Sequence, residues 1–160
     1  IGHEPVQRFE HVIHRMIAEG STVMTEHTET WFFHTGEVVA REAADLWQEA
    51  AVPPLLTSFR PQSLEGARAA APHLPRGLLI DNWTEDAIDS ATALGCLALV
   101  CHYGLWDAPR VARAHAAGLR TLSYTVNDAS VATHVLNLGT DGVITDRVDL
   151  FAPGFNGATS

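Results

Sequence analysis

The chain has 160 residues, 46% of them hydrophobic, with a net charge of −9 and only ten lysines and arginines. This size and composition predict one globular domain with a sizeable core. The acidic balance argues against a nucleic-acid ligand, whose affinity comes largely from neutralised phosphates, and against an anionic membrane surface. The polar opening IGHEPVQRFE is unlike a secretory signal, and no apolar run approaches the roughly 20 residues that cross a bilayer.

The first 50 residues predict two helices and a strand. Residues 5–20 carry apolar side chains at helical spacing, which predicts an amphipathic helix. Residues 22–25 favour a short strand, and residues 37–50 a second amphipathic helix. The stretch EHTETWFFH between them fits no clear element.

From residue 52 onward strands and helices alternate regularly. Gly118–Leu150 has the clearest signals, because Asp128 can cap a helix and Gly139 can end it. The repeat of about 20–23 residues indicates right-handed βαβ units and a parallel sheet. Strands are expected near residues 55–59, 77–81, 97–101, 119–126 and 142–145, with helices over 62–71, 83–94, 107–117 and 128–138.

With the strand near Val23, these elements make about six βα units in an α/β fold. A complete (β/α)8 barrel typically needs about 250 residues, so an open doubly wound sheet, a partial barrel, and a barrel completed by a second chain remain open. Unpaired strand edges of a partial barrel predict self-association, at least a homodimer. We expect one domain over residues 1–160: a divergent part at 1–34, βα units at 35–153 and a flexible tail at 154–160.

Two cysteines, Cys96 and Cys101, flank the apolar run LALV. Five residues apart on one extended strand, they point to opposite faces. We interpret them as buried reduced thiols rather than a disulfide or a metal pair, which predicts a reducing, cytoplasmic compartment.

Three motifs carry a family resemblance: Ser58-Phe59 at a strand end, YTVND at 124–128 and GTDGVITD at 139–146. With their flanking sequence, over residues 35–153, they resemble the C-terminal part of bacterial glycerophosphodiester phosphodiesterases. The resemblance implies a TIM-barrel fold and a hydrolase of lipid metabolism. It also implies that glycerophosphodiesters are hydrolysed to sn-glycerol 3-phosphate and an alcohol, with a divalent cation (Mg²⁺ or Ca²⁺) and two histidines.

The chain departs from that family in its first part. The His-Arg-Gly strand end, the Glu-x-Asp metal strand and the second histidine before aspartate do not occur. By resemblance, Glu26 takes the glutamate position of a metal-binding Glu-x-Lys strand, with Thr28 where lysine belongs; the alternative is an exposed loop acid. Residues 1–30 resemble the C-terminal end of polysaccharide deacetylases, which predicts a chimera. A fragment, a natural rearrangement and an engineered chain remain open.

Tyr124 and Phe59 are the predicted substrate-binding residues, and no catalytic residue is assigned. The resemblance implies that an aromatic ring at Tyr124 packs on the glycerol moiety; the alternative is a half-buried strand aromatic with a wet hydroxyl. His102 follows a strand directly, so it either faces a ligand or caps the barrel top. Asp81 either helps to bind a cation or begins a loop, and Asp146 is predicted to cap the last helix.

Three hypotheses for function follow. The first is a phosphodiesterase-derived partial barrel with little or no activity alone. The second is a working phosphodiesterase whose missing units come from another chain. The third is a catalytically inert scaffold that self-associates and has no substrate.

Overall fold

The computed structural model describes residues 10–19, 22–30, 48 and 53–151. Within these ranges, five parallel strands form one sheet in chain order, and this sheet does not close into a barrel. The α/β class and the parallel sheet are therefore confirmed. The strands are β3 (Leu56–Ser58), β4 (Arg76–Ile80), β5 (Ala98–His102), β6 (Arg120–Tyr124) and β7 (Gly142–Val143).

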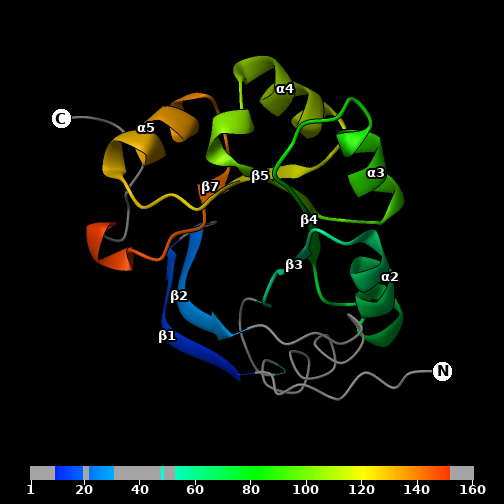
Figure 1. The fold of residues 1–160 in the computed structure, drawn as a ribbon, viewed down its shortest axis with the longest axis horizontal. Coiled ribbons are helices and arrows are strands. Elements are labelled where there is room, and N and C mark those ends of the chain that lie inside the picture. Colours follow the sequence, from blue (N-terminus) through cyan, green and yellow to red (C-terminus); the bar gives the residue numbers. More distant parts are fainter. Residues whose placement is uncertain (1–9, 20–21, 31–47, 49–52, 152–160) are drawn as a thin grey trace.

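A helix follows each of the first four strands of this sheet and lies on the outer side of the arc that the strands form (Figure 1). Each lies close to its predicted position, although α3 begins only at Ala87. The α-helices are α2 (Pro61–Ala70), α3 (Ala87–Ala93), α4 (Ala108–Ala116) and α5 (Ala129–Asn137), and the short 3₁₀ helices are η1 (Tyr103–Leu105) and η2 (Val148–Leu150).

The start and end of α5 form as the sequence predicts. Oδ1 of Asp128 accepts hydrogen bonds from the backbone N–H groups of Ser130 (2.7 Å) and Val131 (3.2 Å), which have no partner within the helix. After the helix, Gly139 adopts a φ of 96°, which a residue with a Cβ rarely takes. The segment between the end of β6 at Tyr124 and the Asp128 cap is therefore a short turn.

The main core fills the layer between the sheet and the helices. Leu99 and Cys101 of β5 are fully buried there and pack with residues of α2, α3 and α4. Because side chains alternate along a strand, Val100 and His102 belong to the opposite, inner face of the arc. The inner face is tight at its centre, since a Cβ added at Gly77 would lie 3.0 Å from Cγ2 of Val100.

Both cysteines are free thiols, and Cys101 is buried as predicted, whereas Cys96 is only partly buried. The prediction that they point to opposite faces is wrong, because Cys96 lies before β5 and packs against the same core cluster that contains Cys101. Burial raises the pKa of the Cys101 thiol to about 12, more than the nearby Arg110 lowers it. Burial likewise raises the pKa of Cys96, against the opposing charge of Arg76. Neither group therefore carries the thiolate character that nucleophilic or metal-binding cysteines need.

The predicted helix over residues 5–20 is wrong for its described part. Glu10–Glu19 forms strand β1, which pairs antiparallel with β2 (Thr22–Thr30) and has a register shift between Ile13 and Arg15. Short apolar clusters fit the spacing of a helix as well as the alternation of a strand. Here the pairing of two strands overrides the local preference for a helix. The predicted strand near Val23 exists, but it belongs to this hairpin and not to the parallel sheet.

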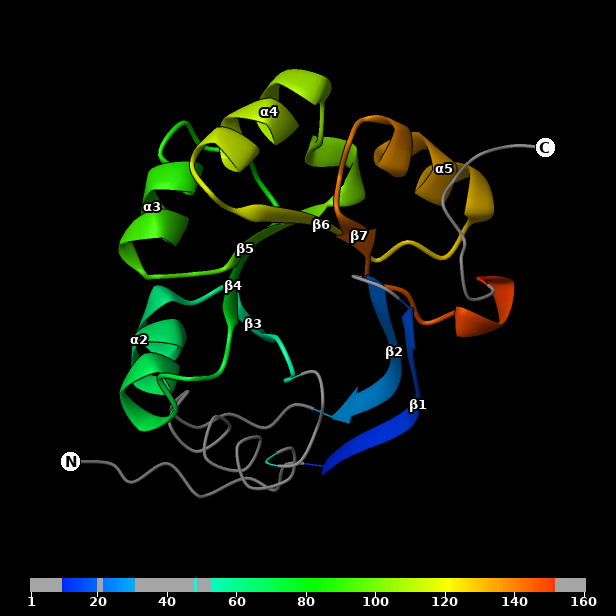
Figure 2. The same ribbon diagram turned by 180° about the vertical axis from the view of Figure 1, so that it is seen from behind.

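The hairpin lies beside the β7 end of the arc, where β2 contacts β7 and η2 (Figure 2). The predicted helix over residues 37–50 and the predicted tail over 154–160 fall outside the described residues, apart from an exposed turn at position 48.

Asp141 ties β6 to β7 at the edge of the sheet where the strands begin. Its Oδ2 accepts from the backbone N–H (2.8 Å) and hydroxyl (3.0 Å) of Thr121 and lies 2.8 Å from Nε2 of His115, while Nη1 of Arg120 donates to Oδ1 (2.9 Å). Partial burial acts to raise the pKa of Asp141, but these donors outweigh it and hold the pKa below its ordinary value. Charge and hydrogen bonding thus fix the register of β6 against β7.

Candidate functional site

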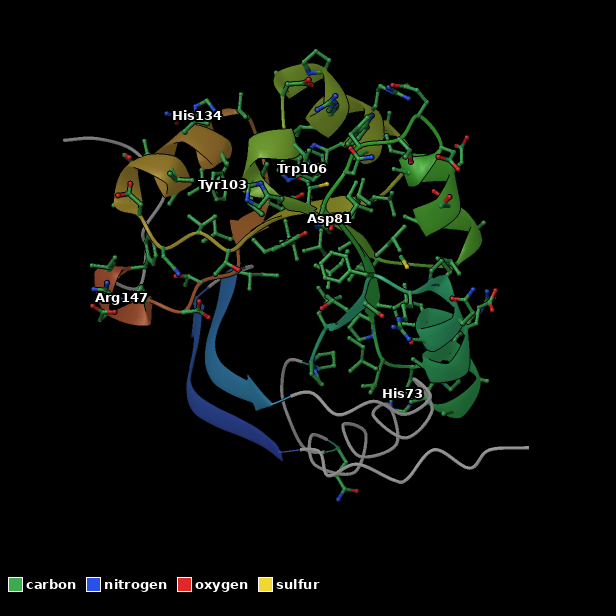
Figure 3. All side chains as sticks on the ribbon, viewed as in Figure 1. His73, Asp81, Tyr103, Trp106, His134 and Arg147 are labelled. Carbon is green, nitrogen blue, oxygen red and sulfur yellow. The ribbon has the colours of Figure 1, made fainter. Side chains whose placement is uncertain are left out.

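The strand ends gather aromatic and polar side chains at one edge of the parallel sheet. Phe59, Asp81 and Asp146 follow β3, β4 and β7, whereas His102 and Tyr124 are the last residues of β5 and β6. All parallel strands end at the same edge, which is where α/β proteins build their sites. Figure 3 shows Asp81, Tyr103 and Trp106 around the ends of β4 and β5, well away from His73 and Arg147.

Tyr124 lies at the centre of this rim. Its hydroxyl donates to the backbone carbonyl of Ile80 at the end of β4 (2.9 Å), which fixes the ring. The ring packs edge-to-face against Phe59, with centroids 5.8 Å apart, and against His102 at 6.1 Å. The two predicted substrate-binding residues are thus brought together, and 52% of Phe59 remains exposed.

The environment keeps the Tyr124 hydroxyl protonated. Burial raises its pKa, and the negative charge of Asp81 and the influence of Cys101 add to that shift. The group is therefore a neutral hydrogen-bond donor near neutral pH, and its hydrogen goes to the Ile80 carbonyl. Tyr124 offers a ligand its ring rather than an acid or a base.

His102 and Tyr103 extend the aromatic rim beyond Tyr124. Their rings lie 4.3 Å apart at a tilt of 32°, and Tyr103 is 36% exposed. Nδ1 of His102 accepts a hydrogen bond from the backbone N–H of Gly104 (3.2 Å), so the His102 side chain caps the start of η1. The His102 ring therefore lies at the rim. This position agrees with both alternatives from the sequence, namely facing a ligand and capping the barrel top.

Asn127 and Asp146 interact with each other across the ends of β6 and β7. Nδ2 of Asn127 donates to Oδ2 of Asp146 (3.2 Å), while Oδ1 of Asn127 accepts from the backbone N–H of Asp146 (2.9 Å) and the hydroxyl of Thr145 (3.1 Å). The prediction that Asp146 caps the last helix is wrong, because this side chain turns back toward Asn127 instead. The pair closes the rim beside β7.

Behind the rim, sequence reasoning missed a cluster of tryptophans and an arginine. Nε1 of Trp106 donates to the Leu122 carbonyl (3.0 Å), and the Trp106 ring packs edge-to-face on Trp83, with centroids 6.1 Å apart. The guanidinium of Arg110 lies 4.6 Å from the centre of the Trp83 ring and also pairs with Asp107 (3.4 Å). The available signal was one tryptophan in each of two consecutive strand-to-helix loops. The cluster supports the loop that follows His102.

The described residues form no cluster of side chains that could hold a divalent cation by themselves. Over residues 10–19, 22–30, 48 and 53–151, no three His, Cys, Asp or Glu side chains converge as ligands would. Glu26 lies within β2, opposite Arg15 in the register, and not in a loop. Its predicted role as a metal ligand stays a prediction.

Within residues 10–19, 22–30, 48 and 53–151, no helix is long and apolar enough to span a membrane.

A family model decides the relationship. The model for the glycerophosphoryl diester phosphodiesterase family matches residues 10–150, most of the chain. The chain belongs to this family. The match includes residues 10–34, which the motif resemblance had left outside; a composite origin of the chain stays a prediction. A search of curated proteins finds no match.

Solved structures agree with the family. An Oleispira antarctica phosphodiesterase, in complex with the product sn-glycerol-3-phosphate, is 27% identical with a TM-score of 0.62, covering 69% of this chain and 46% of its own. A Silicibacter pomeroyi protein named for the same activity is 28% identical with a TM-score of 0.60, covering 69% and 41%. A third, from Agrobacterium tumefaciens, is 26% identical with a TM-score of 0.61, covering 71% and 48%.

The chain matches less than half the length of each of these three proteins. Its open arc therefore corresponds to part of a phosphodiesterase barrel, which agrees with the predicted TIM-barrel relationship. The rim built by Phe59, His102 and Tyr124 lies at the edge of the sheet where such barrels place their sites.

Proposed function

We propose that this chain carries the glycerol-binding rim of a glycerophosphodiester phosphodiesterase and has little or no activity alone. Tyr124 and Phe59 pack on the glycerol moiety, and a divalent cation, with Glu26 among its ligands, serves the complete enzyme. Two things support inactivity of the isolated chain: its sequence lacks the His-Arg-Gly and Glu-x-Asp motifs of the family, and its described residues form no ligand cluster.

One observation carries this proposal, namely the fixed Tyr124 ring at the strand ends. The hydrogen bond to Ile80 and the edge contact with Phe59 hold the ring before any ligand arrives. A preorganised aromatic surface binds an apolar CH face without losing side-chain entropy. Glycerol presents such a CH face beside its hydroxyls, so this rim suits it.

Release of sn-glycerol 3-phosphate from glycerophosphocholine tests the catalytic half of the proposal. We expect the chain, with Mg²⁺ or Ca²⁺, to release no more product than the blank, because its sequence lacks the His-Arg-Gly and Glu-x-Asp motifs that the resemblance assigns to catalysis. The Oleispira antarctica phosphodiesterase serves as the positive control. Release that disappears on chelation and in Glu26→Ala would show a working enzyme and overturn the inactive assignment.

We also propose that the chain self-associates. The two outer strands of the parallel sheet, β3 and β7, each have a pairing partner in that sheet on one side only, although β2 contacts β7. An outer strand of a sheet can pair with a strand of a second chain. Sedimentation velocity at micromolar concentration is expected to give at least a dimer. A single monomeric boundary across the concentration range would contradict it. This self-association is also what the alternative function, an inert scaffold, would require.

The cytoplasmic location remains a proposal. It rests on the two free thiols, one buried and one partly buried, which are typical of a reducing compartment.

A further inference from the structure

His102 belongs to the inner face of the arc, on the same side as Tyr124. In the ladder between β5 and β6, His102 is the register partner of Tyr124, as Val100 is of Leu122. The neighbours on the other face, Leu99 and Cys101, pack against the helices. His102 therefore lies on the side of the sheet that contributes the substrate rim.

Packing and a hydrogen bond hold the His102 ring in one orientation. The Tyr103 ring lies 4.3 Å away, and the Tyr124 ring meets it edge-on at 6.1 Å. The backbone N–H of Gly104 donates to Nδ1 (3.2 Å), so Nδ1 is an acceptor. In a neutral imidazole the other nitrogen then carries the hydrogen, which makes Nε2–H a donor.

This donor is left without a protein acceptor in the described part of the chain, although His102 is exposed at the rim. We propose that Nε2–H of His102 donates to a hydroxyl of the glycerol moiety that packs on Tyr124. His102 is then a positioning residue that selects glycerol phosphates over phosphate esters without hydroxyls. The inference rests on the proposed function, because it needs the glycerol moiety at Tyr124.

Selection of this kind follows from the cost of an unpaired donor. A site built to hydrogen-bond a substrate hydroxyl rejects the analogue that lacks it, since binding the analogue strips water from the donor without replacing the bond. His102 is partly screened by two rings, and its second nitrogen is already engaged. A hydroxyl beside Tyr124 is the acceptor that this arrangement lacks.

The test compares sn-glycerol 3-phosphate with n-propyl phosphate, which has the same carbon chain but no hydroxyl. Dissociation constants are measured by calorimetry for the wild type, His102→Asn and His102→Gln. Asparagine can accept from Gly104 but lacks a donor at the Nε2 position, whereas the glutamine amide reaches that position. We expect the wild type to prefer glycerol phosphate about tenfold, which is one decade for a well-made hydrogen bond.

His102→Asn is expected to lose this preference and His102→Gln to keep most of it. His134→Asn is the control and should behave as wild type, because the His134 side chain is exposed on α5. Thermal unfolding confirms that each variant is folded. Equal preference in His102→Asn and wild type overturns the inference while binding at the rim stands. No binding of either ester by the wild type overturns both the inference and the proposed rim.

Discussion

Replacing Leu99 with alanine is expected to lower the free energy of unfolding by about 3 kcal/mol, within the range of about 2–5 kcal/mol for buried Leu→Ala changes. Leu99 is completely buried in the middle strand of the sheet, between neighbours from three helices. Its closely packed neighbours can move only partly into the space that the side chain leaves. The loss therefore includes both the hydrophobic transfer free energy of the removed atoms and the cost of the remaining cavity.

Leu97→Ala is the matched control, because Leu97 lies two residues earlier and is 49% exposed. Urea denaturation should place Leu97→Ala within about 0.5 kcal/mol of wild type, as is usual for surface changes. Equal losses for the two variants would mean that the layer between sheet and helices is not the main core.

The parallel part of the fold could be predicted because each of its signals is local. Apolar runs such as residues 97–101, which the structure forms into β5 (Ala98–His102), the Asp128 cap and the Gly139 exit act over a few residues. Their regular spacing implies βαβ units. The structure follows these signals closely from β3 to α5. Strand order then follows from the short right-handed connections.

The N-terminal hairpin could not be predicted in the same way. Residues 10–19 have apolar clusters that fit a helix as well as a strand, and the pairing of β1 with β2 decides between them. Strand pairing depends on a second segment, so a single-segment pattern does not contain it. The register shift near Ile13 further removes the strict alternation that marks a strand.

For the candidate rim, the positions of its residues could be predicted from the sequence, but their contacts could not. The motif resemblance selected Tyr124 and Phe59, and parallel topology placed both at one edge. Their edge-to-face packing, the bond from Tyr124 to Ile80 and the bond from Asn127 to Asp146 join residues from different βα units. Such contacts depend on side-chain directions that spacing along the chain does not encode.

Tyr124→Ala, which removes the ring, is expected to raise the dissociation constant for sn-glycerol 3-phosphate, measured by calorimetry, at least about tenfold. A decade corresponds to about 1.4 kcal/mol, which is the order expected when some 50 Å² of apolar contact is lost. Tyr124→Phe keeps the ring and its contacts with Phe59 and His102 but loses the hydrogen bond to Ile80. We expect Tyr124→Phe to bind within about threefold of wild type, since the lost bond fixes the ring rather than contacting the ligand.

The most direct test of the glycerol-binding rim is titration of the isotope-labelled chain with sn-glycerol 3-phosphate, followed by amide chemical shifts. In the wild type and the Leu97→Ala control, we predict saturable shifts at the strand ends around Phe59, His102 and Tyr124, lost at the same concentrations in Tyr124→Ala. Absence of saturable shifts in the wild type, unchanged binding in Tyr124→Ala, or shifts centred on Asp141 at the opposite edge would contradict the account.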